Sequence, residues 1–271
     1  MKKFRTCAAL ALAGILTIGL LSGCGKKEGV TLKVGASPAP HAEILEVVKG
    51  ILAEQDITLE IVEYNDYIVP NEAVESGEND ANYFQHITYL NDFNEQNGTN
   101  LTAIADIHYE PMGLYAGKVA TIEELPEGAT IGIPADPTNE ARALLLLEAA
   151  GLITLNPDAG IAATPYDVTE NPKNLKFNEM EAAQLPRALA DLDMAVINGN
   201  YALQAELSAS NDALISETAD SLAATNYANV LVVKTGTEDE PKLQALAQAL
   251  QSQEVKDFIE TTYDGNVQPL F

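Results

Sequence analysis

Apolar and polar residues alternate in short runs along the first part of the chain, and stretches of helical spacing separate the runs. Alternation with a period of two predicts a strand with one buried face, whereas apolar residues three and four positions apart predict an amphipathic helix. Strands are predicted at residues 31–36, 57–62, 80–84 and 101–109, and helices at 40–52, 66–75 and 86–96. Strands that alternate with helices in this way predict a mainly parallel sheet covered by helices.

The same pattern restarts after Pro111. Strands are predicted at residues 129–133, 174–179, 194–197 and 229–233, and helices at 121–125, 137–150, 181–190, 201–208, 241–250 and 254–262. The helix over 137–150 has the clearest ends, because Asp136 can cap it, Pro137 suits its first turn and Gly151 follows it. The chain is therefore predicted to contain two α/β units.

Two α/β units in one chain predict two lobes that face each other across a cleft. We place the crossovers near residues 110–113 and 224–229, so that residues 31–111 and 228–271 form lobe 1 and residues 112–227 form lobe 2. The return of the last segment to lobe 1 is inferred from the fold class and not from periodicity. Ligands of open α/β sheets bind beyond the carboxyl ends of the strands, which makes the cleft the predicted binding site.

The N-terminus has the pattern of a processed export signal. Three basic residues among the first five precede an apolar run over residues 7–21, which is short of the about 20 residues that span a membrane. The run ends in Leu21-Ser-Gly-Cys24, which resembles the lipobox of bacterial lipoproteins. We predict a signal peptide over residues 1–23, lipid on Cys24, a polar tether over 24–30, and attachment to the extracytoplasmic face of the cell membrane. An ordinary signal peptide followed by a chance cysteine is the alternative.

Charge and cysteine content narrow the class of protein further. The chain has 40 acidic and 15 basic residues and a formal net charge of −25. It lacks the basic footprint of a nucleic-acid-binding protein, so we predict no nucleic-acid partner and interpret the acidity as an aid to solubility. The two cysteines are Cys7, in the predicted signal, and Cys24, so the mature domain is predicted to have no disulfide and no cysteine metal ligand.

Signatures of enzymes and metal centres are weak. The chain has no nucleophile elbow, no phosphate-binding loop and no His-Glu-x-x-His motif. His41, His86 and His108 do not stand at a metal-like spacing from one another or from a carboxylate, and acidic pairs such as Glu123-Glu124 fall on predicted solvated faces. We therefore predict no catalytic site, no metal and no cofactor, with a surface hydrolase as the rival hypothesis.

A binding site for an amino acid can be assembled instead. A guanidinium group is the best bidentate partner for a carboxylate, and the chain beyond the signal contains only Arg142 and Arg187. Arg142 lies early in the well-capped helix, one turn after Asn139, so the two share a face near the positive end of the helix dipole. The alternative is a surface arginine paired with Glu140 or Glu148.

Aromatic and amide side chains gather at four predicted strand ends. The clusters are Tyr64–Tyr67, Asn82–His86, Asn198–Tyr201 and Asn226–Asn229. Asn and Gln side chains offer both a donor and an acceptor, and aromatic walls suit an apolar ligand side chain. A thioether sulfur gains about 0.3–1.5 kcal/mol against such rings. Core packing is the alternative for any single aromatic residue.

Several ordered motifs carry a family resemblance. They are Tyr64-Asn-Asp-Tyr67 with Pro70-Asn-Glu-Ala73, Asp80-Ala-Asn82 with Phe84-Gln-His86, Glu110-Pro-Met-Gly-Leu-Tyr115, Ile133-Pro-Ala-Asp-Pro-Thr-Asn139 with Arg142, Glu170-Asn-Pro-Lys-Asn-Leu175, Gln184-Leu-Pro-Arg187, Ala195-Val-Ile-Asn198 and Tyr227-Ala-Asn229. With these motifs the chain resembles, from the lipobox to the C-terminus, the methionine-binding lipoproteins of methionine ABC importers, which form the NlpA lipoprotein family.

The resemblance implies a two-lobed fold of the periplasmic-binding-protein type II, with methionine as the ligand and with an ABC permease and its ATPase as partners. It also implies roles for matching positions. Arg142 would clamp the carboxylate, with Asn139 nearby, and Asn198 and Asn229 would bond the amino and carboxylate groups. The residues implied around the thioether are Tyr67, Phe84 and His86.

Two positions depart from the family pattern. Tyr83 stands where a small residue is common and is expected to reshape the pocket, and Glu110 stands where some members place a pocket tyrosine. Glu110 is expected either to bond an ammonium group or to face water. D-methionine, methionine sulfoxide and a methionine dipeptide therefore stay open as ligands, and a surface lipoprotein without a transport role stays open as a function.

Overall fold

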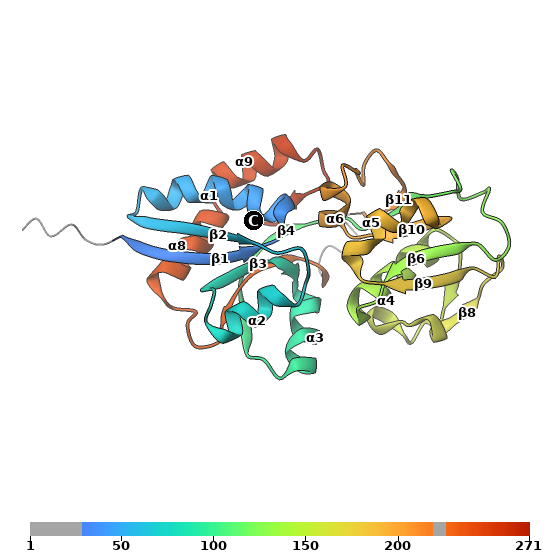
Figure 1. Ribbon diagram of the computed structural model, residues 1–271, viewed down its shortest axis with the longest axis horizontal. Coiled ribbons are helices and arrows are strands. Elements are labelled where there is room, and N and C mark those ends of the chain that lie inside the picture. The colour runs from blue at the N-terminus through green and yellow to red at the C-terminus, as the bar shows by residue number, and fades with distance from the viewer. Residues whose placement is uncertain (1–28, 219–225) are drawn as a thin grey trace, which may run out of the picture.

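The strands of the described residues form two large sheets, which lie one beyond the other along the long axis of the molecule (Figure 1), and one two-stranded sheet. The computed structural model describes residues 29–218 and 226–271. The predicted signal peptide over 1–23, the predicted lipid site Cys24 and most of the predicted tether lie outside these ranges. Among the described residues, no helix is both long enough and apolar enough to cross a lipid bilayer.

The first sheet has the strand order β13-β4-β12-β3-β1-β2. Its strands are β1 (Val30–Ala36), β2 (Ile57–Glu63), β3 (Ala81–His86), β4 (Leu101–Tyr109), β12 (Asn229–Lys234) and β13 (Gln268–Pro269). β1 pairs in parallel with β2 and β3, but β12 runs antiparallel between β3 and β4. The sheet is therefore mixed, because the chain enters its centre from the opposite direction when it returns from the second sheet.

Helices cover both faces of the first sheet (Figure 1). α1 (Glu43–Ala53), α8 (Pro241–Leu250) and α9 (Gln253–Thr262) pack on one face, and α2 (Val69–Ser76) and α3 (Ile87–Asn97) lie on the other. Alternate residues of β12 divide between the two layers: Leu231 and Val233 join the α1 side, whereas Val230 and Val232 join the α2 side. Because β12 is buried on both faces, its sequence is a continuous apolar run and does not alternate with polar residues.

The second sheet has the order β11-β5-β10-β6-β9. Its strands are β5 (Gly113–Ala116), β6 (Thr130–Pro134), β9 (Lys176–Met180), β10 (Met194–Ile197) and β11 (Ala213–Ser216), beside a small pair of β7 (Thr154–Leu155) and β8 (Val168–Glu170). Its helices are α4 (Pro137–Ala149), α5 (Leu185–Ala188) and α6 (Gly199–Gln204). β6 pairs in parallel with β9 and β10, whereas β5 runs antiparallel to β10 and β11.

Two helix predictions were wrong. Residues 121–125 form bends and turns, because the ammonium group of Lys173 binds the carbonyls of Ile122, Glu123 and Leu125 and Pro126 disfavours a helix before it. Residues 181–190 break into a 3₁₀ turn, α5 and a second 3₁₀ turn.

The chain passes between the two sheets after β4 and again before β12. We call the part around the first sheet lobe 1 and the part around the second sheet lobe 2. Residues 31–111 with 228–271, and residues 112–227, remain the proposed boundaries of the lobes.

Candidate ligand-binding site

A small cavity lies between the lobes, and residues of both lobes line it. Lobe 1 lines it with Tyr67, Phe84, Gln85, His86, Tyr89, Glu110 and Asn229, and lobe 2 with Asn139, Arg142, Asn198, Gly199 and Asn200. All predicted site residues except Tyr83 therefore face one cavity.

Strand register brings the lobe 1 residues together. Asn229, the first residue of β12, pairs with His86 at the end of β3 and with His108 near the end of β4. The carboxyl ends of β3 and β4 thus meet the start of the returning antiparallel strand. The cavity lies beyond this edge, as expected for an α/β sheet.

The N-terminus of α4 presents the lobe 2 residues. The Asp136 side chain caps this helix by accepting from the Asn139 backbone N–H at 3.0 Å, as the sequence predicted. The capped first turns place Asn139 and Arg142 on the cavity. Asn198 precedes α6, so Asn198, Gly199 and Asn200 reach the cavity from the end of β10.

Arg142 is buried, and it already has a carboxylate partner. Its Nε and Nη2 donate to the two oxygens of Glu217 at 2.9 and 2.6 Å, and Nη2 also donates to the Glu110 carbonyl at 2.8 Å. The Tyr227 ring lies 4.3 Å from the guanidinium carbon. Burial lowers the pKa of Arg142, but the charge and hydrogen bonds of Glu217, together with Tyr109 and Tyr227, raise it by more and keep the group cationic. The surface partners expected as the alternative, Glu140 and Glu148, are not used by Arg142.

Hydrogen bonds fix the tautomer of His86. Its Nδ1 accepts from the Tyr89 backbone N–H at 3.0 Å, so Nε2 carries the proton and donates to Asn139 Oδ1 at 3.2 Å. The Asn198 side-chain amide donates to the same oxygen at 2.7 Å. Burial and, to a smaller extent, the charge of Arg142 lower the pKa of His86 to about 3, so the ring is neutral.

Two buried amide atoms on the cavity have no partner among the described residues. Asn198 uses its NH₂ group on Asn139, and its Oδ1 is unpaired. Asn200 accepts from the Tyr67 hydroxyl at 2.6 Å, and its Nδ2 is unpaired. An unpaired buried polar atom costs about 1–3 kcal/mol, so a vacant acceptor and a vacant donor beside one cavity indicate a polar ligand.

Aromatic rings form the other wall of the cavity. Tyr67 lies 5.8 Å from Phe84 and 5.6 Å from Tyr89, between ring centroids, and stacks on Tyr201 of lobe 2 at 5.0 Å. These rings offer an apolar surface opposite the polar amides. The lining therefore matches the character of a small molecule with one apolar and one polar end.

The structure places Tyr83 away from the cavity. Tyr83 is fully buried in the core on the α1 side of lobe 1, and its hydroxyl bonds His108 Nδ1. It is adjacent to Phe84, and neighbouring residues of a strand point to opposite faces. Tyr83 therefore does not shape the cavity directly, contrary to the expectation from sequence.

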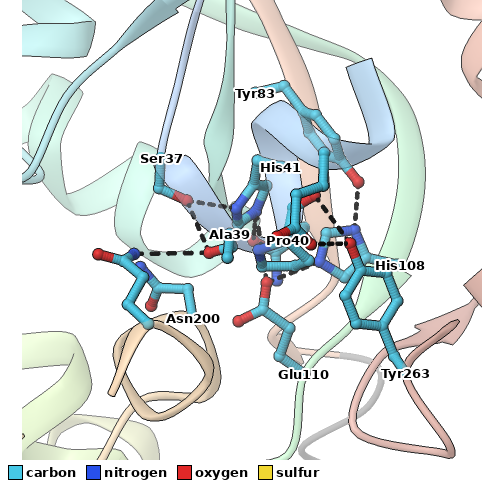
Figure 2. A network of polar contacts seen from close by, with 12 residues as sticks. Ser37, Ala39, Pro40, His41, Tyr83, His108, Glu110, Asn200 and Tyr263 are labelled. Carbon is cyan, nitrogen blue, oxygen red and sulfur yellow. Dashed lines mark hydrogen bonds and ion pairs between the residues drawn. The ribbon is translucent and has the colours of Figure 1, made fainter. Parts of the chain in front are cut away.

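His41, His108 and Glu110 form one buried cluster beside the cavity, shown in Figure 2. His108 Nε2 lies 2.7 Å and His41 Nε2 lies 3.4 Å from Glu110 Oε1. The prediction that these histidines stand apart from one another and from carboxylates was wrong. One ligand atom from each residue lies within 4.8 Å of the others, as in a metal site, but both Nε2 atoms already donate to oxygens, His41 to Asn229 and His108 to Glu110.

Stability is expected to fall between pH 7 and pH 5. Burial lowers the pKa of His41 to about 4 and of His108 to about 3, so these rings and His86 take up protons on unfolding below pH 6.5. Each lowered histidine removes up to about 2 kcal/mol between pH 6.5 and pH 5. Urea unfolding at both pH values measures the loss. His108→Gln should lose about 2 kcal/mol less than the wild type over this range, and an equal loss would contradict the assignment.

Sequence reasoning missed several residues of the site. Tyr89 and Gly199 line the cavity, and Glu217 holds Arg142. Tyr89 stands three residues after His86, so helical spacing could have indicated it. Glu217 gives no local signal, because its partner is 75 residues away.

A cavity between two α/β lobes, with aromatic rings facing unpaired amides, defines a two-lobed substrate-binding protein of type II fold. The chain belongs to the NlpA lipoprotein family, whose sequence profile matches residues 32–271. It is similar to the D-methionine-binding lipoprotein MetQ of Salmonella typhimurium, with 38% identity over 97% of this chain and 97% of that protein.

Two solved structures are similar over the whole length of their chains. A protein from Ruminococcus gnavus has a TM-score of 0.88 and 53% identity, covering 89% of this chain and 99% of its own. A nutrient-binding protein from Burkholderia cenocepacia, solved bound to methionine, has a TM-score of 0.84 and 41% identity, covering 89% of this chain and all 100% of its own. The predicted fold class and family are thereby confirmed.

Proposed function

We propose that this protein is a lipid-anchored binding protein on the extracytoplasmic face of the cell membrane, which captures methionine for an ABC importer. The names of the Salmonella and Burkholderia relatives support methionine as the ligand class. The anchor rests on Cys24 in the lipobox. The importer's permease and ATPase are the proposed partners, and the protein binds its ligand without transforming it.

One observation in the structure carries the proposal: complementary vacant atoms face one cavity. The Asn200 Nδ2 donor is unpaired, and the Arg142 guanidinium lines the same cavity. Both suit a carboxylate. The unpaired Asn198 Oδ1 suits an amino group. A zwitterion satisfies both kinds of atom at once, whereas a simple anion or an apolar molecule does not.

We assign the remaining roles as the family resemblance implies. Asn139 supports the carboxylate site through its bonds to Asn198 and His86. Asn229, held by His41, faces the amino and carboxylate groups. Tyr67, Phe84 and His86 surround the thioether, where sulfur–ring contacts are worth about 0.3–1.5 kcal/mol each.

Ligand capture is coupled to closure of the lobes in this proposal. Tyr67 of lobe 1 donates to Asn200 of lobe 2, and His86 of lobe 1 donates to Asn139 of lobe 2. A ligand that touches both lobes stabilises the closed form by its difference in affinity between the open and closed states. The closed form is the one that would dock on the permease.

The proposal is tested with freshly purified protein. Native mass spectrometry should show a co-purified ligand of methionine mass. After unfolding, dialysis and refolding, calorimetry should show one L-methionine bound per chain, with D-methionine, methionine sulfoxide and a methionine dipeptide as competitors. Binding of none of these compounds would overturn the proposed function, and tighter binding of a competitor would reassign the ligand within the same class.

A further inference from the structure

The charges on the cavity do not balance. Arg142 and Glu110 are the charged residues that line it, since His86 is neutral. Arg142 is already compensated by the two oxygens of Glu217. Among the described residues, no Lys or Arg nitrogen lies within 4.0 Å of the Glu110 carboxylate, whose ion-pair contacts are to the neutral rings of His41 and His108. The carboxyl group of Glu110 is therefore the ionisable group of the lining that lacks a partner of opposite charge.

Glu110 is held so that it cannot turn away. Oε1 accepts from His108 Nε2 at 2.7 Å and lies 3.4 Å from His41 Nε2. The second nitrogen of each ring also has a partner. His41 Nδ1 contacts the Ser37 hydroxyl at 2.6 Å, and His108 Nδ1 bonds the Tyr83 hydroxyl. Figure 2 shows both rings beside the carboxylate. Rings locked by a second layer of hydrogen bonds orient what they touch.

Glu110 has room beside residue 199 because that residue is a glycine. A Cβ atom at Gly199 would lie 2.7 Å from Glu110 Cβ and 2.9 Å from Oε2. Gly199 lines the cavity with Glu110, so the carboxylate meets bare backbone on that side. The other oxygen of Glu110 is thus close to the cavity and free of the two histidines.

We infer that Glu110 is the specificity-determining residue for a free ligand ammonium group, and that His41 and His108 are positioning residues that hold its carboxylate. This inference rests on the proposed function. It adds that the site offers a charge opposite to that of the ligand's ammonium group, whereas its carboxylate meets groups that are already neutral overall. The ammonium meets a buried, unpaired anion. The carboxylate meets an ion pair that is already neutral, together with uncharged amides. Loss of the ligand's ammonium should therefore cost more affinity than loss of its carboxylate charge.

Other groups around Glu110 bear on its protonation. Burial raises the pKa of Glu110, and the proximity of His41 and Arg142 together with the backbone N–H of Asn200 opposes this rise without cancelling it. The titratable groups that face it are His41 from the turn before α1, His108 from β4, Arg142 with Glu217 from lobe 2, and the hydroxyls of Tyr67, Tyr83 and Tyr263. Acid should weaken ligand binding, because the protonated carboxyl no longer attracts an ammonium group.

The first test compares ligands that differ in one charged group. Calorimetry or competition is run with L-methionine, L-methioninamide, N-acetyl-L-methionine and 4-(methylthio)butanoate, which lacks the amino group. The wild type should bind the two compounds without an ammonium at least about tenfold more weakly than methioninamide. Glu110→Gln should lose most of the preference for L-methionine over 4-(methylthio)butanoate, whereas Glu75→Gln, a carboxylate outside the cavity, should keep it.

The outcomes separate this inference from the proposed function. No binding of L-methionine to the wild type means that the proposed function fails. Normal binding of L-methionine with equal binding of 4-(methylthio)butanoate overturns the inference alone. Each titration is repeated with EDTA, and a loss of L-methionine binding in EDTA would also overturn it, because the cluster would then hold a metal ion in place of the ammonium.

The second test concerns the positioning role. His108→Leu removes the donor to Glu110, so the pH below which affinity declines should move upward. His108→Gln keeps an N–H near the position of Nε2, so its pH profile should stay close to that of the wild type. A loss of affinity in His108→Leu that is the same at every pH would contradict the positioning role, since a purely structural defect has no reason to follow the ionisation of Glu110.

Discussion

Replacing Arg142 with alanine is expected to weaken methionine binding by at least about tenfold, or about 1.4 kcal/mol. The guanidinium lines the cavity and donates to Glu217 and to the Glu110 carbonyl through Nε and Nη2, and in the proposed complex it is also a donor to the ligand carboxylate. A hydrogen bond to a charged group is worth about 1.5–3 kcal/mol, so the loss of this donor alone accounts for the effect. Isothermal titration calorimetry measures the change.

Arg142→Ala also leaves the Glu217 carboxylate buried without its cation, which costs about 3–5 kcal/mol of stability. Arg142→Lys separates the two effects. Lysine keeps a positive charge for Glu217 but has no fork of donors, so the fold should survive while binding stays weak. Thermal unfolding checks the fold of both variants. Unchanged affinity in a folded Arg142→Lys protein would show that Arg142 only supports Glu217.

The second large effect is expected at Gly199. In Gly199→Ala the new methyl group would lie 2.7 Å from Glu110 Cβ and 2.9 Å from Oε2, closer than real contacts of this kind. Glu110 or the start of α6 must move, and α6 carries Asn200, whose Nδ2 faces the cavity. Both shifts disturb polar contacts to the ligand, so affinity should fall by about tenfold or more.

Gly50→Ala is the matched control. Gly50 lies inside α1, and a Cβ there has no heavy atom within 4 Å. That substitution should leave binding unchanged and raise stability by roughly 0.5–1 kcal/mol, since alanine is the better helix former. If Gly199→Ala binds methionine as well as Gly50→Ala does, the contact between residue 199 and Glu110 is not needed for the site.

Part of the site was predictable because its causes are local. The cap by Asp136 and the first-turn proline locate the start of α4, and helical spacing then places Asn139 and Arg142 on one face. Phe84 and His86 are two residues apart on one strand and so share a face. Tyr83 lies on the opposite face, in the core on the α1 side, whereas Gln85, which has the same alternation, reaches the cavity near the end of the strand.

Other contacts depend on how the sheets assemble. His41 bonds Asn229 across 188 residues, and Arg142 bonds Glu217 across 75. No pattern of neighbours encodes such pairs, because the register of β12 between β3 and β4 decides which residues meet. The mixed character of the first sheet has the same origin, since periodicity does not reveal strand direction.

The amino-acid sequence alone determined the two α/β units, most of their strands and helices, the capped end of α4 and the resemblance to the NlpA lipoprotein family. These follow from interactions between residues close along the chain and from ordered motifs. Tertiary structure alone decided the charge balance of the cavity, by pairing Arg142 with Glu217 and surrounding Glu110 with neutral histidines. Charge compensation in a buried site depends on distance in space and on exclusion of water, and neither quantity exists before the lobes fold.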